Sequence, residues 1–379
     1  MQTASSAANW PSVALYDLIV VGGGPAGTAG AITASKSGAK VLLLERGRLP
    51  RQRVCGEFVS AESLELLSGL LADAAPSLLF ASVRITSARL FVEERTITTP
   101  VSPAAASIAR FDLDAALWKA AQEAGVDCRL QTTVEGIERQ DVFVVKSSGR
   151  TFRSRALILA AGRWSNFDSR ARADEHSSQQ WLGIKAHFAE ESPPESVDLY
   201  FFEGGYCGVQ PVRVAESDRS AGRVNACAMV QADAARTLPE VFRQHPQLLE
   251  RSRRWQPLME TMTTFPLVFR EPCPVQDQIL RVGDAAGFVD PFVGDGISLA
   301  LRSGALAADC LAAFIRSEIS LEEAAARYSQ QYKTRLLPVF RSSSKIRRLL
   351  DLPRPIRRVA THLLEKTPAV SRLLVTLTR

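Results

Sequence analysis

Residues 16–46 read YDLIVVGGGPAGTAGAITASKSGAKVLLLER, and this stretch decides the fold. Its first six residues form a short apolar run rich in β-branched side chains, which is typical of a buried strand. Small, helix-compatible residues follow three glycines, and a second apolar run begins at residue 39. The order of strand, glycine turn, helix and strand predicts one β-α-β unit.

The glycines within this unit have the spacing of a dinucleotide-binding turn, GxGxxG, at Gly22, Gly24 and Gly27 with Pro25 and Ala26 between them. The first glycine permits the tight turn, the second admits a pyrophosphate close to the backbone, and the third lets helix and strand pack closely. Amides at the helix N-terminus then face the phosphate charge.

An acidic residue, Glu45, ends the second strand eighteen residues beyond Gly27. A carboxylate in this position accepts hydrogen bonds from an adenosine ribose. The alternative interpretation is a glycine-rich turn followed by a surface acid. The strand, glycine turn, helix, second strand and acid follow one another at the required spacing, which favours a dinucleotide. The motif does not by itself distinguish NAD from FAD.

A second glycine-rich segment, RVGDAAGFVDPFVGDGISLALRSG at residues 281–304, favours FAD. Gly283 and Asp284 follow a predicted strand, and Gly294 and Gly296 precede a long predicted helix. Asp284 is placed to accept hydrogen bonds from ribityl hydroxyls, and the amides up to Ile297 to approach the pyrimidine side of a flavin. The cofactor predicted for this chain is therefore FAD.

The remaining pattern predicts an α/β protein with a Rossmann-type FAD-binding fold, a fused antiparallel-sheet substrate domain of α+β type, and a helical C-terminal arm. Residues 111–125 predict a helix, and four strand-like runs between residues 181 and 230 predict the antiparallel sheet. The predicted FAD-binding domain comprises residues 1–75, 101–175 and 275–330. The predicted substrate domain comprises residues 76–100 and 176–274, and the arm begins at residue 331.

Composition and cysteine usage fit a folded cytoplasmic protein, since 46% of the 379 residues are hydrophobic and 23% are charged. The six cysteines are scattered without a CxxC pair or metal-ligand spacing to the four histidines, so we expect reduced thiols and no metal site. Neither a signal peptide nor a membrane span is expected.

The net charge of +6 is concentrated at the C-terminus. Residues 332–379 hold twelve Lys or Arg against two acidic residues, a local net charge of +10, which leaves about −4 on the rest of the chain. Short amphipathic helices in this arm would either pack on the substrate domain, which we favour, or contact an anionic membrane surface peripherally. Nucleic-acid binding is not expected, because basic and aromatic residues do not interleave.

The chain resembles the FAD flavoproteins of the para-hydroxybenzoate hydroxylase fold, and within them the geranylgeranyl reductase-like branch. The resemblance rests on the two glycine segments and on RQRVCGEFVS (51–60), ARFDLDAAL (109–117), AAGRWS (160–165) and GGYCGVQPV (204–212). It implies further FAD contacts from Arg46, Arg53, Val54, Cys55, Arg110, Val134, Ala161, Gly162 and Pro291. The hydroxylases usually carry Asp-Gly where this chain has Ala161-Gly162, which argues against direct NAD(P)H-dependent hydroxylation.

Three residues are candidates for catalysis: Cys55, Glu57 and Tyr206. By the resemblance, Cys55 and Glu57 lie near the flavin and would supply or relay the proton that accompanies hydride transfer; a buried cysteine and a loop acid holding an arginine are the alternative. Tyr206 forms an aromatic wall or donates a hydrogen bond, and we favour the wall. His187 alternates with Lys185 on one face of a predicted strand, where a lone histidine is more often structural.

The favoured function is reduction of a carbon–carbon double bond in an apolar prenyl, lipid or polyketide-like small molecule by an FAD-dependent oxidoreductase. An FAD-dependent monooxygenase of an aromatic or polyketide substrate is the main alternative, and a non-catalytic flavin or lipid carrier is a weaker one. The tryptophan-rich segment of flavin-dependent halogenases is missing at residues 208–212. No separate nicotinamide motif occurs, so NAD(P)H would visit the flavin transiently, and the sequence does not identify the electron donor.

Overall fold

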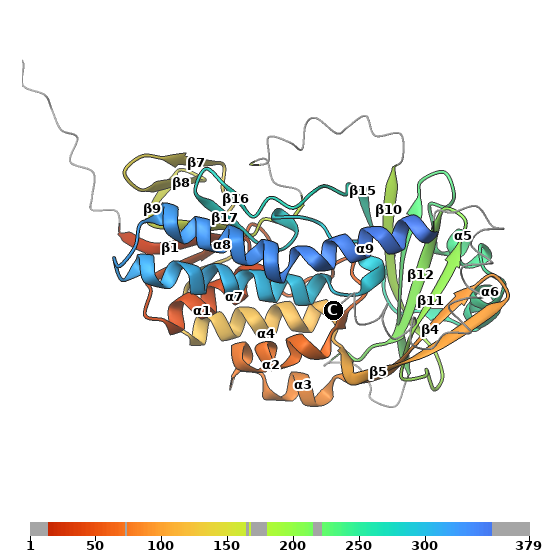
Figure 1. The fold of residues 1–379 in the computed structure, drawn as a ribbon. Helices are drawn as coiled ribbons and strands as arrows, with labels where there is room; N and C mark the ends of the chain where they lie inside the picture. Colours follow the sequence, from red (N-terminus) through yellow and green to blue (C-terminus); the bar gives the residue numbers. More distant parts are fainter. Residues whose placement is uncertain (1–13, 73, 164–166, 168–179, 215–221, 351–379) are drawn as a thin grey trace, which may run out of the picture.

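The computed structural model describes residues 14–72, 74–163, 167, 180–214 and 222–350 of the chain. Two β-sheets organise these residues, one covered by long helices and the other by short ones (Figure 1). The larger apolar core lies around the first sheet and its helices, and a second core lies between the second sheet and its short helices. The C-terminal arm beyond residue 350 lies outside the described residues.

The first sheet has a parallel centre, as the sequence predicted. Its strands, in spatial order, are β16 (Val275–Gln276), β17 (Ile279–Arg281), β9 (Arg150–Leu159), β1 (Leu15–Val21), β2 (Val41–Leu44) and β6 (Asp127–Arg129), and a β-hairpin of β7 (Gly136–Arg139) and β8 (Phe143–Ser147) joins β9. Every residue of β2 is buried, which explains its uninterrupted apolar run.

Helices cover this sheet, and the β-α-β unit predicted from residues 16–46 is confirmed. The helices are α1 (Pro25–Lys36), α2 (Ala61–Leu71), α3 (Pro76–Ala81), α4 (Arg110–Glu123), α7 (Gly296–Ile315) and α8 (Leu321–Arg335), and α9 (Leu337–Leu350) runs from α8 toward the second sheet (Figure 1). Helices α1 and α7 lie side by side, with α8 against α7 (Figure 1). Their close approach requires Gly304, where a Cβ would lie 2.0 Å from the carbonyl oxygen of Ala26.

Helix α7 is the one helix in the described part of the chain that is long and apolar enough to cross a membrane. Its most apolar 18-residue window is 67% buried inside the protein. Its apolar side chains are therefore used largely in the core, against α1 and α8.

The second sheet confirms the antiparallel strands predicted between residues 181 and 230. Its order is β14 (Gln256–Pro257), β10 (Trp181–Ala189), β13 (Arg223–Gln231), β12 (Gly205–Pro211), β11 (Ser196–Phe202), β4 (Val83–Val92), β5 (Arg95–Ser107) and β3 (Phe58–Val59), with β15 (Met262–Leu267) also on β10. Helices α5 (Leu238–Arg243) and α6 (Pro246–Ser252) pack on its far side (Figure 1).

The chain passes from one sheet to the other at positions that the hydrophobic pattern of the sequence does not reveal. Strand β5 stays in the second sheet to Ser107, so the expected boundary at residue 100 falls inside a strand. Strand β3 also pairs with β5, although it lies within the first range assigned to the FAD-binding domain. The segment just before β3, residues 51–57, therefore lies where the two sheets meet.

Candidate functional site

A pocket of about 480 Å³ opens at the carboxyl ends of β1, β9 and β17 and extends to the second sheet. The carboxyl edge of a parallel sheet is where open α/β folds bind their ligands. Nineteen of the twenty predicted cofactor residues line this pocket, and so do the three catalytic candidates. The exception is Gly27, which lies behind the turn.

The glycine turn has the geometry that its sequence requires. Gly22 has φ of 114°, and a Cβ there would lie 2.3 Å from the carbonyl oxygen of Ala160. At Gly27 a Cβ would lie 1.8 Å from the carbonyl oxygen of Gly22, so this glycine serves packing alone. At Gly24 nothing lies within 4 Å of the missing Cβ, which leaves the space open toward the pocket. The turn thus presents bare backbone to a ligand.

Glu45 is buried at the end of β2 and closes the far side of the turn. Its Oε2 accepts from the Gly23 amide at 2.8 Å, and its Oε1 accepts from the Gly47 amide and from Arg51, both at 2.7 Å. Burial alone would raise the pKa of Glu45, but the two amides and Arg51 lower it more, so the net pKa is below its usual range. An ionised carboxylate retains lone pairs for a ribose hydroxyl.

A basic wall forms one side of the pocket, with Arg46, Arg51, Arg53 and Arg110 in its lining. Burial and the neighbouring charges of Arg51 and Arg110 lower the pKa of Arg53 to about 10. Arg110 lies at the start of α4 and pairs through two hydrogen bonds, of 2.9 and 2.8 Å, with Asp114. A diphosphate would relieve the repulsion among these guanidinium groups, so the donor set fits the anionic part of FAD.

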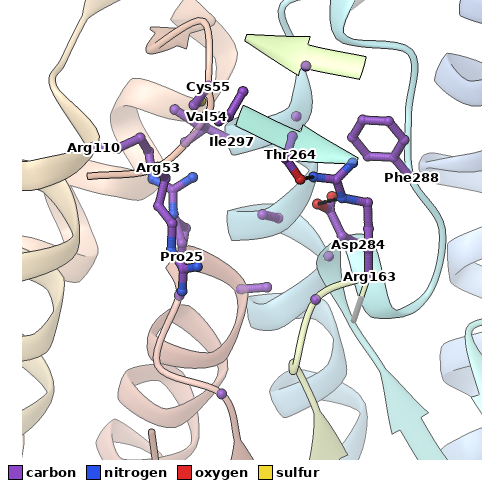
Figure 2. A pocket seen from close by; sticks show the side chains of 18 of the residues that line it. Pro25, Arg53, Val54, Cys55, Arg110, Arg163, Thr264, Asp284, Phe288 and Ile297 are labelled. Atoms are coloured by element: carbon purple, nitrogen blue, oxygen red, sulfur yellow. Dashed lines mark hydrogen bonds and ion pairs between the residues drawn. The ribbon is translucent and has the colours of Figure 1, made fainter. Parts of the chain in front are cut away.

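The opposite wall consists of Arg163, Asp284 and Phe288 (Figure 2). Arg163 lies over the Phe288 ring at 4.3 Å, donates to Thr264 Oγ1 at 3.2 Å, and approaches Asp284 Oδ2 at 3.7 Å. Enclosure by protein raises the pKa of Asp284, and Arg163 opposes that rise. The Asp284 side chain keeps 40% of its surface open, so its carboxylate is available to hydroxyl groups in the pocket.

The glycine turn that the sequence predicted before a long helix lies between η3 (Pro291–Val293) and α7 and lines this wall of the pocket. Gly294 has φ of 72°, and a Cβ there would lie 3.0 Å from the Phe58 ring. Gly296 begins α7, so the free amides of its first turn lie at the pocket lining. These amides suit an electron-rich ring edge, which fits the pyrimidine side of a flavin.

The three catalytic candidates have different surroundings. Cys55 is half-buried in the pocket lining, and its Sγ accepts from the Glu57 amide at 3.3 Å. Tyr206 packs edge-on to Phe292 at 5.8 Å, and its buried hydroxyl has no hydrogen-bond partner among the described residues. Cys55 and Tyr206 both line the pocket, and the Tyr206 ring forms part of its aromatic wall.

Glu57 is fully buried, and its carboxylate binds two side chains of β10. Oε1 accepts from Lys185 Nζ at 2.5 Å, and Oε2 lies 2.8 Å from His187 Nε2. Burial raises the pKa of Glu57, but Lys185 and His187 lower it by more than burial raises it. The carboxylate is therefore ionised at neutral pH. Such a carboxylate has no proton to donate, and it holds a lysine and a histidine rather than the arginine side chain considered above.

Sequence reasoning missed several residues that the fold brings to the site. Arg51, Arg163, Thr264, Phe288 and Met229 line the pocket, and Lys185 and His187 lie behind it. The alternation of Lys185 and His187 was a usable signal, because two polar residues on the buried face of a strand require partners. No local signal indicates that Glu57 is that partner.

The fold and the site together define a flavoprotein with a Rossmann-type FAD-binding domain. Residues 16–341 match the family described as FAD binding domain, and the chain belongs to this family. The protein is an FAD-dependent oxidoreductase.

Curated relatives of this chain have different names. A digeranylgeranylglycerophospholipid reductase of Methanocella arvoryzae is 27% identical over 343 residues, which cover 85% of this chain and 83% of the relative. Protein FixC of Escherichia coli K12 is 26% identical, with 90% of this chain and 86% of the relative covered.

Solved structures share the fold across nearly the whole chain. The flavin-dependent brominase Bmp2 superposes with a TM-score of 0.78 at 17% identity, covering 96% of this chain and 93% of that one. A geranylgeranyl bacteriochlorophyll reductase-like protein from Thermoplasma acidophilum gives a TM-score of 0.70 at 20% identity, covering 96% and 99%. At these identities the likeness establishes the fold alone.

Proposed function

We propose that this enzyme reduces a carbon–carbon double bond in an apolar prenyl, lipid or polyketide-like substrate. The observation that carries the proposal is the position of the Cys55 thiol in the pocket lining, with Arg110 on the same side (Figure 2). Apolar side chains of the second sheet, including Tyr206, Met229 and Leu267, line the pocket as well. A proton donor beside an apolar wall suits the addition of hydrogen to an alkene.

Bound FAD would supply the hydride for this reaction. The protein must then deliver one proton to the other carbon of the double bond, and the Cys55 thiol is the group in the pocket that we assign to this step. The Sγ–H bond breaks and a C–H bond forms, which leaves a thiolate that solvent reprotonates. Arg110 and the Glu57 amide face that thiolate and stabilise its negative charge.

The names of two relatives support this assignment. A digeranylgeranylglycerophospholipid reductase covers most of this chain, and its name refers to reduction of a lipid that carries geranylgeranyl chains. A second protein of this name, from Thermoplasma volcanium, is 26% identical over 84% of this chain. We therefore place the substrate of this enzyme among molecules with isoprenoid or similarly extended apolar chains.

Anaerobic turnover tests the proposal. The FAD-loaded enzyme, reduced with dithionite, is incubated without oxygen with a geranylgeranyl lipid, and the products are measured by mass spectrometry. We expect two added hydrogens for each reduced bond. Product that forms only in air, with stoichiometric oxygen consumption, would instead identify a monooxygenase.

A pair of cysteine variants tests the role of the thiol. Cys55→Ser should lower product formation by about 100-fold or more, because a positioned acid contributes on that order. Cys128→Ser changes a thiol on β6 outside the pocket and serves as the matched control. Equal activities of the two variants would remove Cys55 from the mechanism.

We also propose that NAD(P)H or another reductant reaches the flavin transiently and that the enzyme acts in the cytoplasm. If the basic C-terminal arm does not pack on the substrate domain, it would contact an anionic membrane surface peripherally and so bring the enzyme to a lipid substrate. Sedimentation with vesicles that contain phosphatidylglycerol, compared with neutral vesicles, tests the membrane contact. An anaerobic assay tests the donor: NADPH or NADH is added to the FAD-loaded enzyme, and reduction of the FAD is monitored by its visible absorbance.

A further inference from the structure

The loop at residues 54–57 is held by one face of the second sheet. Gly183, Lys185 and His187 alternate along β10 and face this loop. A Cβ at Gly183 would lie 3.2 Å from the Val54 side chain, so the strand and loop are in close contact. The pocket wall that carries Cys55 is therefore built on β10.

Strand β13 adds a second anchor beside the first. Asn225 is paired with His187 across the two strands. Its Nδ2 donates to the carbonyl oxygens of Cys55 and Gly56, both at 2.9 Å. The backbone at and directly after Cys55 is thus fixed by a side chain that lies 170 residues away from Cys55 in sequence.

Glu57 connects this anchor to the two pocket residues that matter for chemistry. Its amide donates to Cys55 Sγ, and its Oε1 accepts from the Arg110 amide at 2.9 Å. Arg110 begins α4, whose N-cap residue is Ala109 and has no side-chain oxygen. The carboxylate of Glu57 therefore takes the place of the missing cap and fixes the start of the helix.

The cost of this arrangement argues that it has a purpose beyond stability. Glu57 and Lys185 are each 0% exposed and His187 is 1% exposed. Desolvation of buried ion pairs often exceeds their mutual attraction, so apolar side chains of equal volume would serve stability as well or better. Glu57 also has φ of 63°, which is a strained conformation for a residue with a side chain.

We propose that Lys185 and His187 are positioning residues that act through Glu57 to hold the Cys55 thiol and Arg110 in place within the pocket. The proposal rests on the proposed function in that Cys55 is taken as the proton donor. Glu57 itself is a positioning residue too, because it lies in the pocket lining but its ionised carboxylate is occupied by Lys185, His187 and the Arg110 amide. The three side chains form a rigid support behind the thiol.

Alkylation of individual cysteines by iodoacetamide tests the support without any substrate. The FAD-loaded full chain is labelled, and each cysteine peptide is quantified by mass spectrometry. In His187→Leu, which removes the donor to Glu57 Oε2, we expect Cys55 to react at least five-fold faster because its loop is released. The buried thiols of Cys207 and Cys310 should keep their rates.

Two further variants separate positioning from general loosening. His187→Gln keeps an N–H donor for Glu57 and should restore the wild-type rate at Cys55. Asp198→Asn disrupts a different buried ionic group of the same sheet, where Asp198 binds Arg89 and Arg251, and should leave Cys55 unchanged. Lys185→Met should act like His187→Leu; if Lys185→Met fails to fold, His187→Leu carries the test alone, since the Lys185–Glu57 pair remains in it.

Three outcomes would overturn the inference: a Cys55 rate in His187→Leu within two-fold of wild type, a parallel rise at Cys207, or a His187→Gln rate equal to that of His187→Leu. A substrate assay adds a second readout. His187→Leu should lower kcat at least ten-fold in the wild-type background and cause no further loss in Cys55→Ser. If labelling behaves as expected but no alkene is reduced, the positioning inference stands and the proposed function fails.

Discussion

A methyl group added at Gly27 should destabilise the folded protein, whereas one added at Gly24 should weaken cofactor binding. At Gly27 the new Cβ would lie 1.8 Å from the carbonyl oxygen of Gly22 and 3.1 Å from the Ala160 Cβ. Overpacking a core costs about 1–3 kcal/mol, and because this contact is with backbone we take the upper value of about 3 kcal/mol. That corresponds to a roughly 150-fold fall in the ratio of folded to unfolded protein.

The matched change at Gly24 separates packing from cofactor binding. Nothing lies within 4 Å of a Cβ there, and φ of −78° suits alanine. Gly24→Ala should therefore leave the free energy of unfolding of the FAD-free protein within about 0.5 kcal/mol of wild type. The methyl group faces the pocket, so we expect the Kd for FAD to rise at least ten-fold.

Urea unfolding of the FAD-free proteins and titration with FAD measure the two effects. If the free energy of unfolding of Gly27→Ala lies within 1 kcal/mol of the wild-type value, the prediction is wrong, because the turn would then have room that the structure does not show. The prediction is refuted equally if Gly24→Ala is destabilised by more than 1 kcal/mol, or binds FAD with unchanged affinity.

Three further predictions concern buried polar groups. Tyr206→Phe removes a buried hydroxyl without a partner among the described residues and should raise the free energy of unfolding by about 1 kcal/mol in urea; a loss of that size would mean that the hydroxyl has a partner. Arg110→Met leaves the buried Asp114 carboxylate without its bidentate partner and should lower the free energy of unfolding by about 3–5 kcal/mol. Lys119→Met breaks an exposed ion pair and should lower it by under about 1 kcal/mol, so equal losses in the two variants would contradict the prediction. Glu45 has a lowered pKa when folded, so it stabilises the protein above its unfolded pKa of about 4.3 and that contribution is lost as pH falls further. Glu45→Gln should therefore be less stable than wild type at pH 7, and the gap should narrow below about pH 4; a gap constant with pH in urea titrations would show that ionisation of Glu45 is irrelevant.

Contiguous motifs made the cofactor site accessible to sequence reasoning. Residues 16–46 contain the turn, the helix and the acid that terminates β2, and each of them follows from local spacing. The segment at residues 281–304 adds Asp284 and the glycines before α7 in the same way. Because these segments end parallel strands of one sheet, their side chains meet at one edge, and the predicted residues line one pocket.

The extent of each sheet was harder to predict than its existence. Strand β5 alternates exposed and buried residues as far as Ser102, and the chain continues in the same sheet to Ser107 before it enters α4. Nothing in this pattern marks a domain boundary, since the hydrogen-bonding partner of a strand is not written in its periodicity. The expected boundary at residue 100 was therefore misplaced by seven residues relative to the end of β5.

By itself, the sequence determined the β-α-β unit, the glycine turn, the choice of FAD over NAD and the antiparallel character of residues 181–230. Those features depend on residues close together in the chain, where backbone geometry and side-chain period act directly. Only the tertiary structure decided that Glu57 meets Lys185 and His187, 128 and 130 residues later, and that Arg163 meets Thr264, 101 residues later. The physical reason is that a buried charge specifies the need for a partner but not its place in the sequence, and here the packing of the loop at residues 54–57 against β10 supplies that partner.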